Sequence, residues 1–111
     1  MNVELYLKEM GERIMQRRKK LGLTQEALAE LSELTTQFVS YAEAGKRGMR
    51  PENLMKVAAA LEVSTDYLLT GDIINKDKLL FSEKLDKLTP QQVRIVENII
   101  DECIELYSKN E

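Results

Sequence analysis

The sequence predicts an all-α protein of five short helices followed by a helical C-terminal tail. Apolar residues recur at three- and four-residue spacing along most of the chain, as they do on one face of a helix. Helix-capping residues precede these segments at Thr24, Thr35, Ser64 and Thr89. Glycines that can end a helix in the left-handed conformation follow three of them, at positions 22, 45 and 71.

The composition is that of a soluble, globular chain. It has 111 residues, 43% hydrophobic and 32% charged, which suits one domain with a modest core. No run approaches the roughly 18 apolar residues of a membrane helix, and the N-terminus has no signal-peptide pattern. Because Cys103 is the only cysteine, no intrachain disulfide is possible. We therefore expect a cytoplasmic protein that does not associate with membranes.

Three helices are expected before the middle of the chain. The first runs from about Lys8 to Leu21, and residues 1–7 are uninformative. Two short helices joined by a tight turn follow, from about Gln25 to Ser32 and from about Thr36 to Ala44. Their joint apolar face is expected to contain Ala27, Leu28, Leu31, Leu34, Val39 and Ala42.

Two further helices complete the first domain, which we expect to cover residues 1–71. Pro51 marks the first turn of the fourth helix, residues 51–61, and Ser64 caps the fifth, residues 65–70. Residues 72–78 are polar enough to be a linker. The tail, residues 79–111, contains a short amphipathic helix anchored by Leu85 and Leu88, then a long helix that starts at Pro90.

The third helix presents an unusual outward face. It carries four uncharged side chains that can form hydrogen bonds: Thr36, Gln37, Ser40 and Tyr41. A short polar face of this kind, without lysine or glutamate, suits a surface that reads a partner. Basic residues cluster on both sides of it in sequence, at positions 13, 17–20, 46, 47 and 50. Residues 1–71 have no net charge and residues 72–111 carry −3, so the acidity lies in the tail.

The segment TQEALAELSELTTQFVSYAEAGKR resembles the helix-turn-helix of the Cro/cI-type (XRE) regulators. The likeness extends from GERIMQRRKKLGLTQ to PENLMKVAAALEVSTDYLLTG, roughly residues 8–71. It implies a five-helix, lambda-repressor-like DNA-binding domain whose third helix enters the major groove of double-stranded DNA. Gln37 is then the best direct reader, because glutamine can bond adenine N6 and N7 together. Base contacts are expected from Thr36, Gln37, Ser40 and Tyr41.

Phosphate contacts are expected on both sides of the reading helix. The resemblance gives this role to Gln25, and the basic clusters suggest a phosphate-facing patch. The expected set is Gln25, Arg17, Lys46, Arg47 and Arg50. The resemblance also implies a structural ion pair between Arg18 and Glu43. Phe38 is interpreted as a packing residue more than as a thymine contact.

Two glutamates stand where the family commonly has glycine. Glu33 lies in the turn between the two reading helices, and Glu62 follows the fourth helix. If these positions need a positive φ, each glutamate costs roughly 1 kcal/mol. The fold should tolerate this, with a slightly reshaped turn.

The last helix carries more apolar surface than one isolated helix can leave in water. It either folds back on the first domain or pairs with a second copy, and we favour pairing because the five-helix domain is already complete. The expected dimerisation residues are Val93, Val96, Ile99, Ile100, Cys103, Ile104 and Tyr107.

The favoured function is a sequence-specific transcriptional regulator, a repressor that binds an inverted-repeat operator as a homodimer. The alternative is an antitoxin- or antirepressor-like module that uses the same fold to bind a protein, which leaves room for a protein antagonist. An enzyme is rejected, since the chain has no histidine and no plausible nucleophile or phosphate loop. We expect no catalytic residue, no metal and no cofactor. The operator, the regulated genes and the inducing signal are outside what the sequence specifies.

Overall fold

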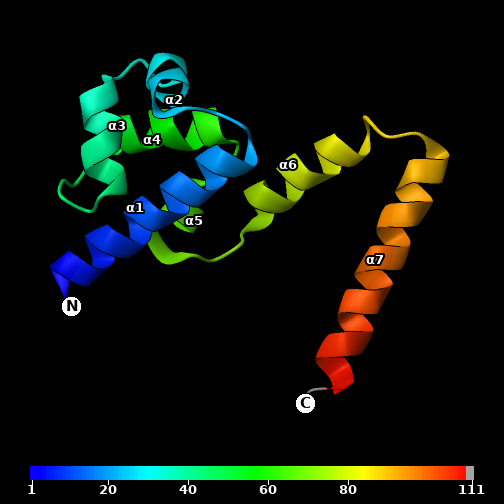
Figure 1. The fold of residues 1–111 in the computed structure, drawn as a ribbon. Coiled ribbons are helices and arrows are strands. Elements are labelled where there is room, and N and C mark those ends of the chain that lie inside the picture. The colour runs from blue at the N-terminus through cyan, green and yellow to red at the C-terminus, as the bar shows by residue number, and fades with distance from the viewer. Residues whose placement is uncertain (110–111) are drawn as a thin grey trace. The chain divides into compact units, whose positions relative to one another are not determined.

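The computed structural model describes residues 1–109 and is entirely helical over this range (Figure 1). The helices are α1 (Val3–Lys20), α2 (Gln25–Leu31), α3 (Thr36–Glu43), α4 (Pro51–Leu61), α5 (Thr65–Thr70), α6 (Asn75–Leu85) and α7 (Pro90–Lys109). The chain divides into two compact units, Met1–Lys78 and the part from Leu79 onward. The expected all-α class is confirmed. No helix among residues 1–109 is both long and apolar enough to cross a membrane.

The predicted helix starts are confirmed at their caps. The hydroxyls of Thr24, Thr35 and Ser64 each accept a hydrogen bond, at 3.0 Å, from the backbone N–H three residues later. The first helix begins earlier than the expected Lys8, because the Asn2 side chain accepts a bond from the Leu5 N–H and caps it. The added turn brings Tyr6 against the core.

The first four helices end in the same way. The residue at each end has a positive φ, at Gly22 (72°), Glu33 (58°), Gly45 (72°) and Glu62 (57°). The N–H of the next residue then donates to the carbonyl five positions earlier, which satisfies an otherwise unpaired helix carbonyl. The two glutamates therefore occupy the strained conformation that was anticipated for them.

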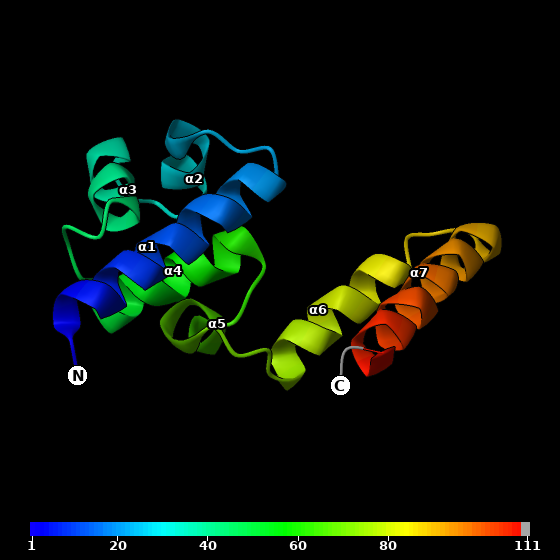
Figure 2. The same ribbon diagram turned by 60° about the horizontal axis from the view of Figure 1, so that its bottom comes forward.

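One hydrophobic core joins the first five helices. α3 packs against one side of α1 and α5 against the other, as Figures 1 and 2 show. The buried core residues are Met10, Ile14, Leu28, Ala29, Phe38, Val39, Ala42, Leu54, Val57, Ala58, Leu61, Val63 and Leu68. One expectation is wrong: Leu31 is 59% exposed, because the helix ends there and its side chain points away from the core. Ala27 and Leu34 are only partly buried.

Gly11 allows α1 to lie directly on the end of α3. A Cβ built on Gly11 would lie 2.4 Å from the carbonyl oxygen of Ala42 and 2.6 Å from that of Glu43. Gly45 has a similar role, since a Cβ there would lie 2.8 Å from the Cα of Lys8. Only a residue without a side chain permits this backbone contact. No feature of the sequence pattern distinguishes Gly11 from the other residues of its helix.

Part of the segment expected as a linker is helical. α6 begins at Asn75, and Asp77 in its first turn accepts three hydrogen bonds from Ser64 and Ile74. Burial by itself raises the pKa of the Asp77 carboxyl, but these hydrogen bonds outweigh that effect and hold the pKa below its ordinary value. The boundary between the two units follows Lys78.

The second unit exposes its apolar residues. Thr89 and Gln92 cap α7 reciprocally, with Thr89 N–H to Gln92 Oε1 at 2.9 Å and Gln92 N–H to Thr89 Oγ1 at 3.2 Å. This confirms the start that was predicted at Thr89–Pro90. Apolar side chains on α7 that are more than a third exposed are Val93, Ile95, Ile99, Ile100, Ile104, Leu106 and Tyr107. Cys103 is also exposed.

Candidate nucleic-acid interface

The outward face of α3 carries the four polar side chains that were expected there. Thr36 and Gln37 are exposed, Tyr41 is 41% exposed and Ser40 is half-buried. The Gln37 amide nitrogen donates to the Tyr41 hydroxyl at 3.1 Å, one helical turn away. Tyr41 therefore orients Gln37 along the helix surface. The Gln37 amide keeps a second N–H and its carbonyl oxygen for a partner.

The opposite face of α3 holds the helix in the core. Phe38, Val39 and Ala42 are buried, which confirms the packing interpretation of Phe38. The Arg47 guanidinium lies 4.8 Å from the centre of the Phe38 ring. This cation–π contact ties the loop after α3 back to the helix. Arg47 thus has an internal partner on one face while it remains exposed to solvent.

A buried ion pair joins α1 to the end of α3. Arg18 Nε donates to Glu43 Oε2 at 2.6 Å, and Arg18 Nη2 donates to Glu43 Oε1 at 3.0 Å. The two side chains are only 11% and 4% exposed. The hydrogen bond and charge of Glu43 raise the Arg18 pKa above its ordinary value. The two-point contact orients α3 on α1.

Gln25 belongs to the same network. Its amide nitrogen donates to Glu43 Oε1 at 3.1 Å, and Arg18 Nη1 donates to the Leu23 carbonyl at 2.9 Å. The start of α2, the end of α3 and α1 are thus joined around one carboxylate. The amide of Gln25 is half-buried and held in place, with one N–H left over.

The loop between α3 and α4 is basic and exposed. Lys46, Arg47 and Arg50 all lie on it, and all three are exposed to solvent. Arg50 is also the N-cap residue of α4, although its side chain makes no capping bond. These three cations therefore lie on one connection that directly follows the polar face of α3.

The arginines of α1 have a different environment from the one expected. Arg17 Nε donates to the Leu61 carbonyl at 2.9 Å, and Arg13 Nη1 donates to the Leu68 carbonyl at 3.0 Å. Both acceptors lie near helix C-terminal ends, where carbonyls lack partners and a positive charge is favourable. This arrangement gives no support to a phosphate contact by Arg17. The contact of Arg13 with the Leu68 carbonyl has no signal in the sequence, since the two residues are 55 positions apart.

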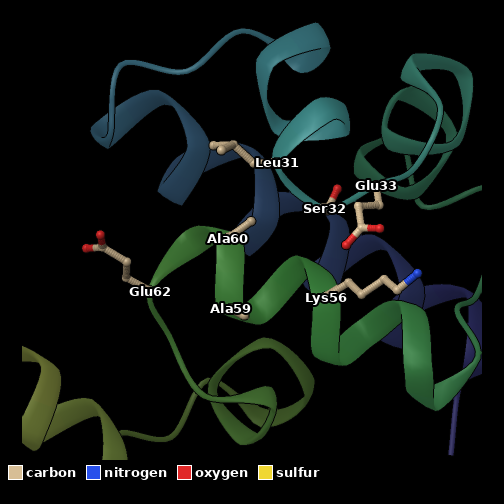
Figure 3. A pocket seen from close by; sticks show the side chains of 7 residues that line it. All are labelled: Leu31, Ser32, Glu33, Lys56, Ala59, Ala60 and Glu62. Atoms are coloured by element: carbon tan, nitrogen blue, oxygen red, sulfur yellow. The ribbon is translucent and has the colours of Figure 1, made fainter.

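One hollow in the first unit is separate from these residues. It has a volume of about 470 Å³ and lies between the end of α2 and one face of α4 (Figure 3). Its lining consists of Leu31, Ser32, Glu33, Lys56, Ala59, Ala60 and Glu62. None of the residues expected to contact DNA lines it. The polar face of α3 and the basic loop are therefore the candidate site.

Comparison with known proteins identifies the fold. Residues 14–68 match a helix-turn-helix family model. The repressor protein C2 of Salmonella phage P22 is 41% identical over 73 residues, which cover 66% of this chain and 32% of that repressor. The chain spans 32–64% of the lengths of the curated relatives that it matches.

This chain matches two solved structures over nearly their whole length. The P22 c2 repressor in complex with a synthetic operator has 43% identity and a TM-score of 0.56, over 57% of this chain and 96% of that one. A chain of the SinR protein/SinI protein complex has 25% identity and a TM-score of 0.55, over 92% of this chain and 99% of that one. The chain therefore belongs to the helix-turn-helix family of Cro/cI-type (XRE) regulators.

Proposed function

We propose that this chain is a sequence-specific DNA-binding transcription regulator that represses by occupying an inverted-repeat operator as a dimer. The observation that carries the proposal is the uncharged polar face of α3, held outward by the buried Arg18–Glu43 pair. The P22 repressor that binds a synthetic operator shares this fold at 43% identity. A rigid helix with an exposed polar face has the properties that major-groove reading requires.

In this proposal Gln37 reads an adenine. Its remaining N–H and its carbonyl oxygen suit the N7 and N6 positions of that base. The Tyr41 hydroxyl accepts a 3.1 Å hydrogen bond from the Gln37 amide and so restrains that side chain. Thr36 and Ser40 are the other two side chains placed to contact base edges or the adjoining backbone.

Phosphate contacts come from the loop cations and from the start of α2. Lys46, Arg47 and Arg50 are exposed beside α3, and Gln25 lies at the first residue of α2. These contacts set position and affinity more than sequence preference. Because residues 1–71 have no net charge, the loop cations carry most of the attraction for phosphate in this proposal.

Dimerisation is assigned to α7. Its apolar residues follow a heptad-like series at 93, 96, 100, 103 and 107, widened by the isoleucines at 99 and 104. These side chains are largely exposed in the single chain. Pairing of two such helices would bury them and place two α3 helices on half-sites about 10 bp apart, or a multiple of that spacing.

A protein partner is the second candidate function. The supporting observation is the likeness to a chain of the SinR protein/SinI protein complex, which extends over 92% of this chain and so includes the tail. An antagonist could cover the apolar face of α7 in place of a second copy. In that case the sedimentation of the isolated protein would show a monomer.

Binding-site selection from random duplex DNA tests the proposal. The purified wild type should enrich an inverted repeat, and Gln37→Ala should lose preference at one base pair per half-site, by about 1–3 kcal/mol. Gln16→Ala is the matched control, because Gln16 is an exposed glutamine on α1. Failure of the wild type to enrich any motif would refute sequence-specific binding, and equal weakening on all sequences by Gln37→Ala would refute its role as a reader.

A further inference from the structure

One carboxylate joins the starts of two helices. Asp77 Oδ1 accepts the backbone N–H of Ser64 at 2.8 Å, and Asp77 Oδ2 accepts the Ser64 hydroxyl at 2.8 Å. Oδ2 also accepts the N–H of Ile74 at 3.1 Å. Ser64 is the buried N-cap residue of α5, and the Ile74 carbonyl accepts the first backbone bond of α6. Asp77 therefore caps its own helix and binds it to the cap of another.

These bonds determine where the chain leaves the first unit. Between α5 and α6 the chain runs through Gly71, Asp72 and Ile73, and the last two are exposed. The Ser64–Asp77 contact lies thirteen residues apart in sequence and holds the start of α6 on the first unit. α6 then continues without interruption from Asn75 to Leu85.

We propose that Asp77 is a positioning residue that sets which half-site spacing the dimer accepts. By holding Ile74 and the first turn of α6 on Ser64, it shortens the free connection between the DNA-binding unit and the dimerising tail. This inference rests on the proposed function, because spacing has meaning only for a dimer on two half-sites.

The dimensions of the connection give the reason. One added base pair moves a half-site about 3.4 Å along the axis and turns it by about a tenth of a turn. If residues 72–78 formed a free connection, its root-mean-square span would be about 15 Å, enough to absorb that movement. With Asp77 bound, residues 74–78 no longer add to that span, so the free connection is shorter and a wrong spacing lowers the effective concentration of the second unit more steeply.

Two variants and one control test this in the full chain. Asp77→Ala removes all three bonds, and Asp77→Asn keeps the side-chain volume while it replaces one accepting oxygen by a donor. Asp72→Asn is the control, because it makes the same charge change at an exposed residue whose carboxylate takes no part in the contact. Each protein is titrated with the selected operator and with duplexes whose half-sites are moved apart by one to five base pairs.

The wild type and Asp72→Asn should lose about 10²-fold in affinity between the best and the worst spacing. Asp77→Ala should lose less than about tenfold over the same series, with Asp77→Asn between them. Amide hydrogen exchange gives an independent readout without DNA: protection of Ser64 and Ile74 should fall by about tenfold or more in Asp77→Ala.

The outcomes separate this inference from the function beneath it. If Asp77→Ala weakens binding equally at every spacing, or leaves the protection of Ser64 and Ile74 unchanged, the positioning role is refuted while the dimeric regulator stands. If the wild type sediments as a monomer and binds the two half-sites independently, the proposed dimer is refuted, and the spacing role with it.

Discussion

Removal of the Glu43 carboxylate should leave the buried Arg18 guanidinium without its charged partner. In Glu43→Ala, Arg18 loses two hydrogen bonds to the carboxylate, at 2.6 and 3.0 Å, and Gln25 loses one at 3.1 Å. The Arg18 side chain is only 11% exposed, and only its bond to the Leu23 carbonyl remains. Breaking a buried pair from one side costs about 3–5 kcal/mol. The remaining bond and exposure place the expected loss near the lower end, at about 3 kcal/mol.

This loss is large for a unit of this size. At about 0.05–0.15 kcal/mol per residue, a unit the length of Met1–Lys78 has a stability of about 4–12 kcal/mol. Urea unfolding of Glu43→Ala beside the wild type measures the difference. Glu9→Ala is the control, because the Glu9 side chain is 54% exposed and its 3.6 Å pair with Arg13 is worth about 0–1 kcal/mol.

A double variant distinguishes the destabilisation caused by one unpaired buried charge from the net contribution of the ion pair to stability. Arg18→Met/Glu43→Leu replaces both charges with apolar groups, and it should recover most of the stability that Glu43→Ala loses. A loss in Glu43→Ala no greater than that of Glu9→Ala would contradict our reasoning. So would a double variant less stable than Glu43→Ala alone.

Three further predictions concern separate parts of the chain. Gly11→Ala should lower the free energy of unfolding by about 1–3 kcal/mol, because its Cβ would meet the Ala42 carbonyl oxygen at 2.4 Å; thermal unfolding would show no shift if α1 could move away freely. The lowered pKa of Asp77 means that its contribution is complete above the unfolded pKa of about 3.9 and is lost as pH falls through the folded value. The difference in unfolding free energy between wild type and Asp77→Asn should therefore shrink below about pH 4. A difference that grows on acidification would contradict the predicted direction. Ile100→Asp should sediment as a monomer. A variant that stays dimeric would show that the dimer interface does not lie on α7.

Local chemistry explains how much of the fold was predictable. The hydroxyls of Thr24 and Thr35 cap helices in the structure because capping needs only the residue and the amide three positions later. Positive φ at Glu33 was considered because the resembling family commonly has glycine at this position, and the structure has φ 58° there. The outward face of α3 was also predictable, since helical spacing separates Gln37 from the buried Val39.

Long side chains were less predictable. Arg17 donates to the Leu61 carbonyl, an acceptor distant in sequence that was not predicted, while its expected phosphate contact stays a prediction. Sequence spacing gives the face of a helix on which an arginine lies, but not which acceptor its flexible side chain reaches. The expected place of Leu31 on the buried face was wrong, because the apolar spacing continues to the end of α2 although the buried core does not.

The sequence by itself determined where α2 to α5 and α7 begin, and which side chains α3 turns outward. These depend on interactions within a few residues, which any sequence displays directly. Only the tertiary structure decided that Gly11 must lack a side chain and that Asp77 binds Ser64. Such contacts depend on the distances between side chains and backbones once the helices have packed, and helical periodicity does not specify those distances.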